Sequence, residues 1–309
     1  MKRAPALASL LLVLAGCAGR PVAPGPGTAP PPPGRPVVPP PPRIVGPDLF
    51  GLQGDMTQGT LLRGVAPAGT ALLMLDGKPV RIAADGRFII GFNRDAPDHA
   101  MLEARLQDGR LLRLPLTIGK RAWDISNLST LPMGTSPSPA YQKIRAAELA
   151  QIAAARALNA NSDGWRQKMI YPTTGRISTL FGSQRIYKGG VEGAYHGGMD
   201  IARPTGTPVA APADGVIALA TAKPFSLEGN LVMIDHGFGL MSAIMHLSRI
   251  DVKQGDHVRQ GQIIGLVGST GRATGPHLHW GLTWQGARID PLLVAGPMPT
   301  GAATTAGAR

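Results

Sequence analysis

Histidine is concentrated in one part of this chain of 309 residues. Six of the seven histidines lie between His196 and His279. Four of them fall in three short clusters, which read His196-Gly197-Gly198-Met199-Asp200, Met245-His246-Leu247 and His277-Leu278-His279. Imidazole nitrogens and carboxylate oxygens are ligands that zinc accepts, and imidazole also moves protons near neutral pH. The clusters therefore predict a metal site, an acid–base pair of histidines, or both.

The cysteine content limits how a metal could be held. Cys17 is the only cysteine, so the chain cannot form an internal disulfide or a cysteine-rich zinc finger. Any metal must be bound by histidine and by aspartate or glutamate. One Asp and two His supply three such ligands, and a catalytic zinc keeps its fourth position for water. Two histidines then stay unassigned, namely His246 and one of the pair His277 and His279.

The local structure around the clusters must bring them together. Residues two apart on a β-strand point to the same face, so His277 and His279 should project into one site while Leu278 faces the core. The glycines that follow His196 argue against a helix, because they allow sharp turns and a close approach of the backbone. We expect a loop there, which enters a strand at Asp200-Ile201-Ala202.

The rest of the sequence predicts a mainly β protein of several parts. Short apolar runs separated by Gly or Asp-Gly turns predict a small β-sandwich-like module over residues 48–122. Residues 123–164 read as a linker with a helix from about Ala140 to Leu158, because Ser138-Pro139 can begin one. Residues 165–295 form a β-rich domain that contains the clusters. His99 and His257 are predicted to be loop histidines without a chemical role.

The sequences at both ends of the chain are predicted to lie outside any folded domain. Residues 1–16 have a basic start and a short apolar run, which is typical of a signal peptide. Leu14-Ala15-Gly16-Cys17 resembles the bacterial lipobox, which implies cleavage before Cys17 and lipid attached to it. Ala18 replaces the aspartate that commonly retains lipoproteins in the inner membrane, which favours the outer membrane, facing the periplasm. Residues 17–47 read as this lipidated cysteine and a Pro-rich linker, and residues 296–309 as a disordered tail.

The charge of the chain narrows the choice of partners. The formal net charge is +12, which favours acidic partners such as anionic lipid or cell-wall polymer, or simply a basic surface with no specific partner. The sequence has no recognition-helix pattern, RNP-type aromatic pattern or zinc-finger spacing. It therefore predicts no nucleic-acid partner.

The stretch from Ile177 to Pro291 resembles the catalytic domain of the M23 (lysostaphin/LytM-type) metallopeptidases. The resemblance rests on ordered motifs: Ile177-Ser178, Phe181-Gly182, His196 to Ile201, Thr205 to Val209, Ala211 to Val216, Ile234 to Gly237, His246 to Ser248, Val258 to Gln262, Gly268 to Gly271 and Thr274 to His279. It implies a compact, mostly antiparallel β domain. It also implies zinc as the cofactor, held by His196, Asp200 and His279, with His246 and His277 as the catalytic histidines.

Two departures from the family pattern concern substrate placement. Ile244 stands where members often have tyrosine, and Trp280-Gly281 replaces the common Phe-Glu. His236 is expected to have a structural role. Tyr195 is expected to pack or to line the substrate, with assistance to the oxyanion as the alternative. The sequence also lacks the glutamate of His-Glu-x-x-His enzymes, so the acid–base work is expected from His246 and His277.

The resemblance implies a zinc endopeptidase that hydrolyses peptide cross-links of peptidoglycan during cell-wall remodelling or division. The lipoprotein context favours the bond from D-alanine to diaminopimelate over a glycine bridge. One alternative is a non-catalytic M23-like regulator of cell-wall amidases, against which the complete ligand set argues. The other is an envelope scaffold with structural zinc, but structural zinc normally has four protein ligands.

Overall fold

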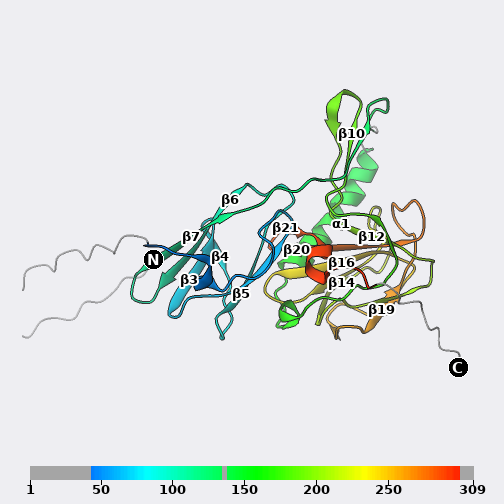
Figure 1. The fold of residues 1–309 in the computed structure, drawn as a ribbon. Coiled ribbons are helices and arrows are strands. Elements are labelled where there is room, and N and C mark those ends of the chain that lie inside the picture. Colours follow the sequence, from blue (N-terminus) through cyan, green and yellow to red (C-terminus); the bar gives the residue numbers. More distant parts are fainter. Residues whose placement is uncertain (1–42, 134–137, 300–309) are drawn as a thin grey trace, which may run out of the picture. The chain divides into compact units, whose positions relative to one another are not determined.

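The computed structural model describes residues 43–133 and 138–299. The expected signal peptide, Cys17, residues 17–42 of the expected linker and residues 300–309 of the expected tail lie outside the described residues. Figure 1 shows the path of the chain. Most of the described elements are strands, and the prediction of a mainly β protein is confirmed.

The N-terminal strands form two small sheets. Five strands pair in the order β1-β7-β6-β3-β4, and two further strands, β2 and β5, pair with each other. Their bounds are β1 Arg43–Ile44, β2 Leu61–Val65, β3 Thr70–Leu75, β4 Lys78–Val80, β5 Arg87–Gly91, β6 His99–Leu106 and β7 Leu111–Thr117, after a 3₁₀ turn η1 at Pro47–Phe50. Asp76 and Gly77 both have positive φ between β3 and β4, as a two-residue hairpin turn requires.

Two sequence predictions about this part and the linker are wrong in detail. His99 is exposed as predicted, but it begins β6 and pairs with Thr117. The expected linker also contains a strand, β8 Ile125–Leu128, which pairs in parallel with β10 Gln184–Tyr187. A 3₁₀ turn η3 at Lys188–Gly190 joins β10 to β11 Val191–Glu192. The residues of these strands are exposed or half-buried, so no alternation of polar and apolar residues marked them.

An eight-stranded antiparallel sheet forms the centre of the C-terminal part. Its order is β18-β14-β15-β16-β20-β12-β9, and β21 also pairs with β20. The bounds are β9 Arg176–Thr179, β12 Gly198–Ala202, β14 Gly215–Ala220, β15 Asn230–Asp235, β16 Leu240–Leu247, β18 His257–Val258, β20 His277–Trp284 and β21 Ala287–Ile289. His257 is therefore in a short strand and not in a loop.

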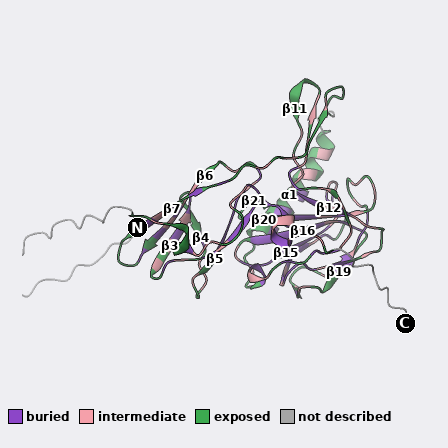
Figure 2. Cartoon of the chain, viewed as in Figure 1, coloured by how far each residue is buried: buried purple, intermediate pink, exposed green. Residues whose placement is uncertain are grey.

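Smaller elements complete this part. Three strands pair in the order β13-β19-β17, with bounds β13 Pro208–Ala210, β17 Arg249–Ile250 and β19 Ile263–Leu266. A 3₁₀ turn η2 spans Gly164–Arg166, and a short helix α2 spans Pro291–Ala295. In Figure 2 the strands of the large sheet are mostly buried, whereas β11 is exposed.

Strand β20 divides the large sheet into a core face and an opposite face. Leu278, Trp280 and Leu282 are buried in the hydrophobic core. Their neighbours along the strand, among them His277 and His279, point to the other side, which we call the site face. The predicted alternation of His277, Leu278 and His279 is confirmed.

Helix α1, Pro139–Ala157, packs on the site face beside the histidines. It begins where the sequence predicted, since Ser138 Oγ accepts a hydrogen bond from the Tyr141 N–H. Its Ile152 and Ala155 are buried in a cluster with apolar residues of β14, β15 and β16. One of these, Met233, pairs with Ala243, which in turn pairs with Gly281 of β20. The helix therefore covers the part of the site face that β14 to β16 form.

The N-terminal strands and the large sheet share one hydrophobic cluster. A methyl group on Gly91 of β5 would lie 2.7 Å from Ile289 Cδ1 and 3.3 Å from Trp284 Cβ, so the backbone of β5 rests directly on these side chains. Neither described helix has the length and hydropathy needed to cross a membrane.

Candidate metal centre

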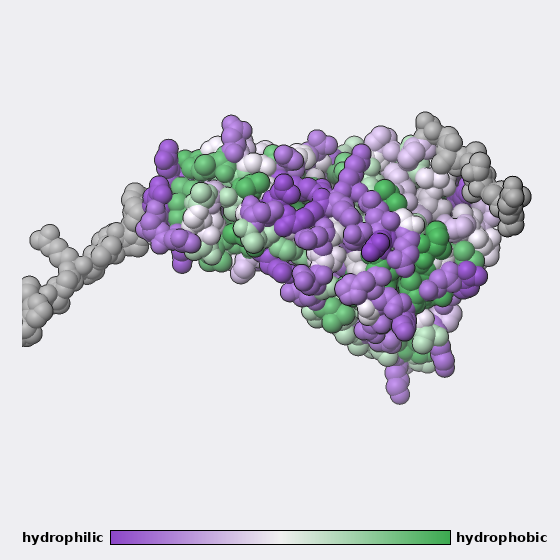
Figure 3. All heavy atoms as spheres, turned by 90° about the horizontal axis from the view of Figure 1, so that it is seen from below, coloured by the Kyte–Doolittle hydropathy of each residue, from purple (hydrophilic) through white to green (hydrophobic). Residues whose placement is uncertain are grey.

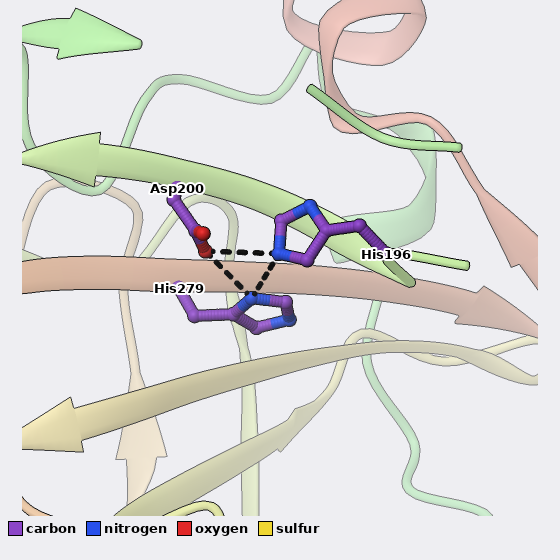
Figure 4. Close-up of side chains that lie close together, drawn as sticks. All are labelled: His196, Asp200 and His279. Atoms are coloured by element: carbon purple, nitrogen blue, oxygen red, sulfur yellow. Dashed lines mark hydrogen bonds and ion pairs between the residues drawn. The ribbon is translucent and has the colours of Figure 1, made fainter. Parts of the chain in front are cut away.

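Three of the predicted residues converge on one point (Figure 4). His196 Nε2 lies 3.0 Å from Asp200 Oδ1 and 3.0 Å from His279 Nδ1, and His279 Nδ1 lies 2.8 Å from Asp200 Oδ1. The three side chains are 19%, 15% and 12% exposed, respectively. Among the described residues this is the single group of three or more His, Cys, Asp and Glu side chains with spacing suited to a metal ion.

Two neighbouring strands set this geometry. Asp200 on β12 pairs directly with His279 on β20, so both side chains point to the site face. Gly198 makes the close approach possible, because a methyl group there would lie 2.4 Å from the Trp280 carbonyl oxygen and 2.7 Å from His279 Nε2. As predicted, a loop follows His196 and enters a strand that contains Asp200, but this strand begins earlier than predicted, at Gly198.

The contacts around these three side chains suit the binding of a metal ion. The Nδ1–H of His196 donates to the Leu180 carbonyl oxygen at 3.0 Å, which leaves the lone pair of Nε2 for the site. Burial by itself raises the pKa of Asp200, but the contacts with His196 and His279 outweigh it and hold that pKa well below its usual range. Burial also lowers the pKa of His279. Both directions favour metal binding, since they keep Asp200 a carboxylate and His279 a neutral imidazole.

The other two predicted histidines lie beside this group. The ring centroid of His246 is 4.8 Å from that of His277 and 6.2 Å from that of His279. His277 Nε2 is 3.8 Å from Asp200 Oδ1. All five predicted site residues are thus brought together.

His246 reaches the site through an unusual backbone conformation. Met245 pairs with His279 and points to the site face, so regular alternation would turn His246 toward the core. Its φ is +62°, a left-handed value that is uncommon outside glycine and is found at functional sites. The His246 N–H donates to the Glu228 carbonyl oxygen at 2.9 Å. This bond holds the turn that redirects the ring.

Both of these rings present Nε2 as their free nitrogen. The Nδ1–H of His246 donates to the Thr270 carbonyl oxygen at 2.8 Å, and the Nδ1–H of His277 donates to the Gly275 carbonyl oxygen at 2.8 Å. Burial, together with the nearby His277 and His279, lowers the pKa of His246 to about 4. His246 is therefore neutral at pH 7 and can accept a proton through Nε2.

The remaining predictions about individual residues have clear outcomes. His236 is fully buried, with Nδ1 at 2.8 Å from the Asp214 carbonyl oxygen and Nε2 at 2.8 Å from Ser242 Oγ, so its structural role is confirmed. Tyr195 donates its hydroxyl proton to Asn93 Oδ1 at 2.9 Å and is a packing residue of the loop before His196.

The two departures from the family pattern lie mostly away from the site. Ile244 and Trp280 are cross-strand neighbours in the core, and Trp280 Nε1 donates to Ser242 Oγ. Only Gly281 is on the site face. Three further positions were missed by sequence reasoning, namely the carbonyl groups of Leu180, Thr270 and Gly275 that orient the imidazoles. A carbonyl group is common to all residue types and gives no sequence signal.

Comparisons with known proteins agree with this geometry. Peptidase family M23 matches residues 194–291. The chain is 43% identical over 123 residues to peptidoglycan DD-endopeptidase ShyA of Vibrio cholerae, and 46% identical over 124 residues to DD-carboxypeptidase/endopeptidase Mpg of Neisseria meningitidis. Each match covers 40% of this chain and 28% of the relative. The chain thus spans little more than a quarter of the length of these curated relatives.

A solved structure extends the likeness to most of the chain. The crystal structure of a putative peptidase M23 from Pseudomonas aeruginosa matches with a TM-score of 0.59 and 30% sequence identity. The match covers 78% of this chain and 95% of that chain, so it includes far more than the M23 segment. With the five histidine and aspartate side chains gathered as described, the chain belongs to peptidase family M23.

Proposed function

We propose that the protein is a zinc-dependent endopeptidase that hydrolyses the peptide cross-links of peptidoglycan. One observation carries the proposal: the His196, Asp200 and His279 group has two further imidazoles beside it, each with Nε2 free. A structural metal site needs no such neighbours, whereas hydrolysis needs groups that move protons.

Zinc suits the ligand set. Members of family M23 are zinc metallopeptidases, and two imidazole nitrogens with one carboxylate oxygen are a typical catalytic zinc set that leaves a position for water. The carbonyl group of Leu180 fixes the ring of His196 in the tautomer that a metal ligand needs. Zinc bound to these three residues would lower the pKa of water toward about 7 and polarise the peptide carbonyl group.

His246 and His277 are proposed to handle the protons. In the neutral ring of His246, Nε2 accepts a proton from the attacking water as its oxygen bonds to the carbonyl carbon. As the bond to the leaving nitrogen breaks, that nitrogen takes up a proton. His277 lies on the same face next to Asp200. In its imidazolium form, with a proton on Nε2 as well as on Nδ1, it would donate through Nε2 to the carbonyl oxygen as negative charge develops there.

The names of the two relatives support a peptidoglycan substrate. A DD-endopeptidase cuts between D-alanine and the D-centre of diaminopimelate, and a DD-carboxypeptidase cuts between two D-alanines. Both bonds have a free carboxylate on the carbon that carries the scissile nitrogen. We assign this chain to such bonds in preference to glycine bridges. A cell-envelope location follows from the substrate, and anchoring to the outer membrane through lipid on Cys17 is part of the proposal.

Digestion of purified sacculi by the full-length protein tests the function. Zinc-loaded protein should convert cross-linked muropeptides into monomers, a chelator should stop the reaction, and added zinc should restore it. Mass spectrometry of the products identifies the bond that is cut. If zinc-loaded protein leaves sacculi intact but makes a cell-wall amidase active, the non-catalytic regulator replaces the endopeptidase.

A further inference from the structure

Arg288 on β21 lies on the site face close to the metal centre. It pairs with Thr283 of β20, and directly opposed residues of an antiparallel pair point to the same side. Thr283 shares its side of β20 with Gly281, His279 and His277. The backbone register therefore places the Arg288 side chain on the face that carries the proposed ligand His279.

Two contacts hold the Arg288 side chain over the loop that carries His196. A methyl group on Gly197 would lie 3.2 Å from Arg288 Cδ, Nε and Nη1, so the side chain rests on the residue after His196. The guanidinium carbon is 5.1 Å from the centroid of the Tyr195 ring. Asn93 Oδ1 accepts both the Tyr195 hydroxyl proton and the Arg288 backbone N–H. The cation is thus anchored by its stem and its backbone.

The charge of Arg288 has no carboxylate partner within residues 43–133 and 138–299. By contrast, Arg94 pairs with Asp95, Arg121 with Asp290, and Arg145 with Glu228. Arg288 is also exposed. Figure 3 shows hydrophilic side chains over much of one face of the molecule, and Figure 4 shows Asp200 and His279 on neighbouring strands with His196 reaching in from the loop before β12. A guanidinium group that is anchored, accessible and unpaired is suited to bind an anion from outside the chain.

We propose that Arg288 determines substrate specificity by binding the free carboxylate on the carbon that carries the scissile nitrogen. This inference rests on the proposed function and goes one step further, because it names the substrate carboxylate as the group that the enzyme recognises. The guanidinium presents two parallel N–H groups to a carboxylate, which an ammonium cannot match. A glycine bridge has no carboxylate at that position, so the same residue would also disfavour neutral bridges.

Three glycines connect the metal centre with the position of Arg288. Gly197, Gly198 and Gly281 carry no side chains between the ligands and β21. A methyl group on Gly281 would lie 3.6 Å from His279 Nε2 and 3.7 Å from the Gly197 carbonyl oxygen. Gly198 and Gly281 are themselves buried, so the short path from His279 to Gly197, on which Arg288 rests, consists of backbone without side chains.

Matched substrates with and without the carboxylate test the proposal. We would measure kcat/KM of the zinc-loaded full-length protein for a stem peptide that ends in D-alanyl-D-alanine and for its C-terminal amide. The second pair consists of a cross-linked muropeptide and its analogue in which one diaminopimelate carboxylate is amidated. This carboxylate is the one on the carbon that carries the scissile nitrogen. Wild type should prefer each acid by about 10- to 100-fold, the range expected for a hydrogen-bonded charge pair.

Variants separate binding of the carboxylate from packing. Arg288→Met keeps the stem over Gly197 and Tyr195 but removes the charge, so it should lose the preference for the acid while still cleaving the amide at the wild-type rate. Arg288→Lys should retain part of the preference. Arg105→Met removes an exposed arginine of β6 and should leave both rates unchanged. Zinc content should equal that of wild type in all three.

The outcomes distinguish this inference from the function on which it rests. If wild type cleaves acid and amide equally well, or if Arg288→Met keeps the preference, the endopeptidase survives and the role of Arg288 is refuted. If Arg288→Met slows acid and amide by the same factor, Arg288 only supports the local structure and the inference is again refuted. If zinc-loaded wild type cleaves none of the substrates, the proposed function fails and this inference fails with it.

Discussion

Removal of the Arg145 side chain should destabilise the protein much more than removal of a neighbouring surface cation. Arg145 of α1 donates to both carboxylate oxygens of Glu228, at 2.6 and 2.7 Å, and to Glu148 Oε2 at 3.0 Å. The side chains of Arg145, Glu148 and Glu228 are 17%, 8% and 7% exposed. Arg145→Ala would leave two poorly hydrated carboxylates without their cation.

The structure sets the size of the loss. Breaking a buried pair by removing one partner costs about 3–5 kcal/mol. Glu148 keeps its bonds from the Ser226 N–H and hydroxyl, at 2.6 and 2.7 Å, which moderates the loss. We therefore expect the free energy of unfolding to fall by about 3 kcal/mol at pH 7. Lys143→Ala, on an exposed turn of the same helix, should change it by less than about 0.5 kcal/mol.

Urea denaturation of both variants at pH 7 and pH 5 is the assay. Burial by itself raises the pKa of Glu148, but hydrogen bonds from Ser226 and Arg145 outweigh it and hold the pKa below the usual value of 4.5. In wild type, the stability due to this lowered pKa is present above about pH 4.5 and is lost as the pH falls through the folded pKa. Without Arg145 the Glu148 carboxylate takes up a proton more readily, so the deficit of Arg145→Ala should shrink at pH 5.

Two results would refute this reasoning. One is a loss at pH 7 no larger than that of Lys143→Ala. The other is a deficit that stays constant or grows at pH 5. Because the Glu228 carbonyl group also holds the His246 backbone, we expect Arg145→Ala to lower the peptidase rate as well as the stability.

Two further changes test individual parts of the site and its support. Burial lowers the pKa of His236 to about 4. As the pH falls, the His236 ring is therefore protonated in the unfolded chain before it is protonated in the folded protein. The free energy of unfolding of wild type should then fall by up to roughly 3 kcal/mol between about pH 6.5 and pH 4. His236→Gln should flatten that slope in urea titrations, and an unchanged slope would contradict the assignment. Gly198→Ala should reduce zinc content and cost about 1–3 kcal/mol of stability, because its methyl group would overlap Trp280 and His279. Gly46→Ala, with open space around it, is the control, and equal effects of the two changes would contradict the overlap.

Sequence periodicity and turn chemistry predicted those parts of the fold that depend on local rules. His277 and His279 share a face because strand side chains alternate, and Leu278 is buried for the same reason. Helix α1 begins at Pro139 because Ser138 caps it, and no glycine or proline interrupts the helix between Ala140 and Ala157. These features need only neighbouring residues, so one sequence was sufficient.

Other features depend on contacts between distant segments and could not be predicted. The left-handed turn at His246 reverses the alternation that holds elsewhere in β16, and the Glu228 carbonyl group that stabilises it lies in another loop. The parallel pairing of β8 with β10 joins a mostly exposed strand to a mostly half-buried one, and neither has an alternating pattern of buried residues that hydrophobic periodicity could reveal. The contact of Arg288 with Gly197 depends on the register between β20 and β21.

The most direct test of the division of roles in the site compares zinc content and muropeptide release in His279→Ala and His277→Ala. We predict that His279→Ala loses zinc and activity together. We also predict that His277→Ala keeps about one zinc per chain, as an intact three-ligand set allows, yet releases no monomeric muropeptides. If His277→Ala instead cleaves at the wild-type rate, or if it loses zinc as His279→Ala does, the division into three ligands and two catalytic histidines is wrong.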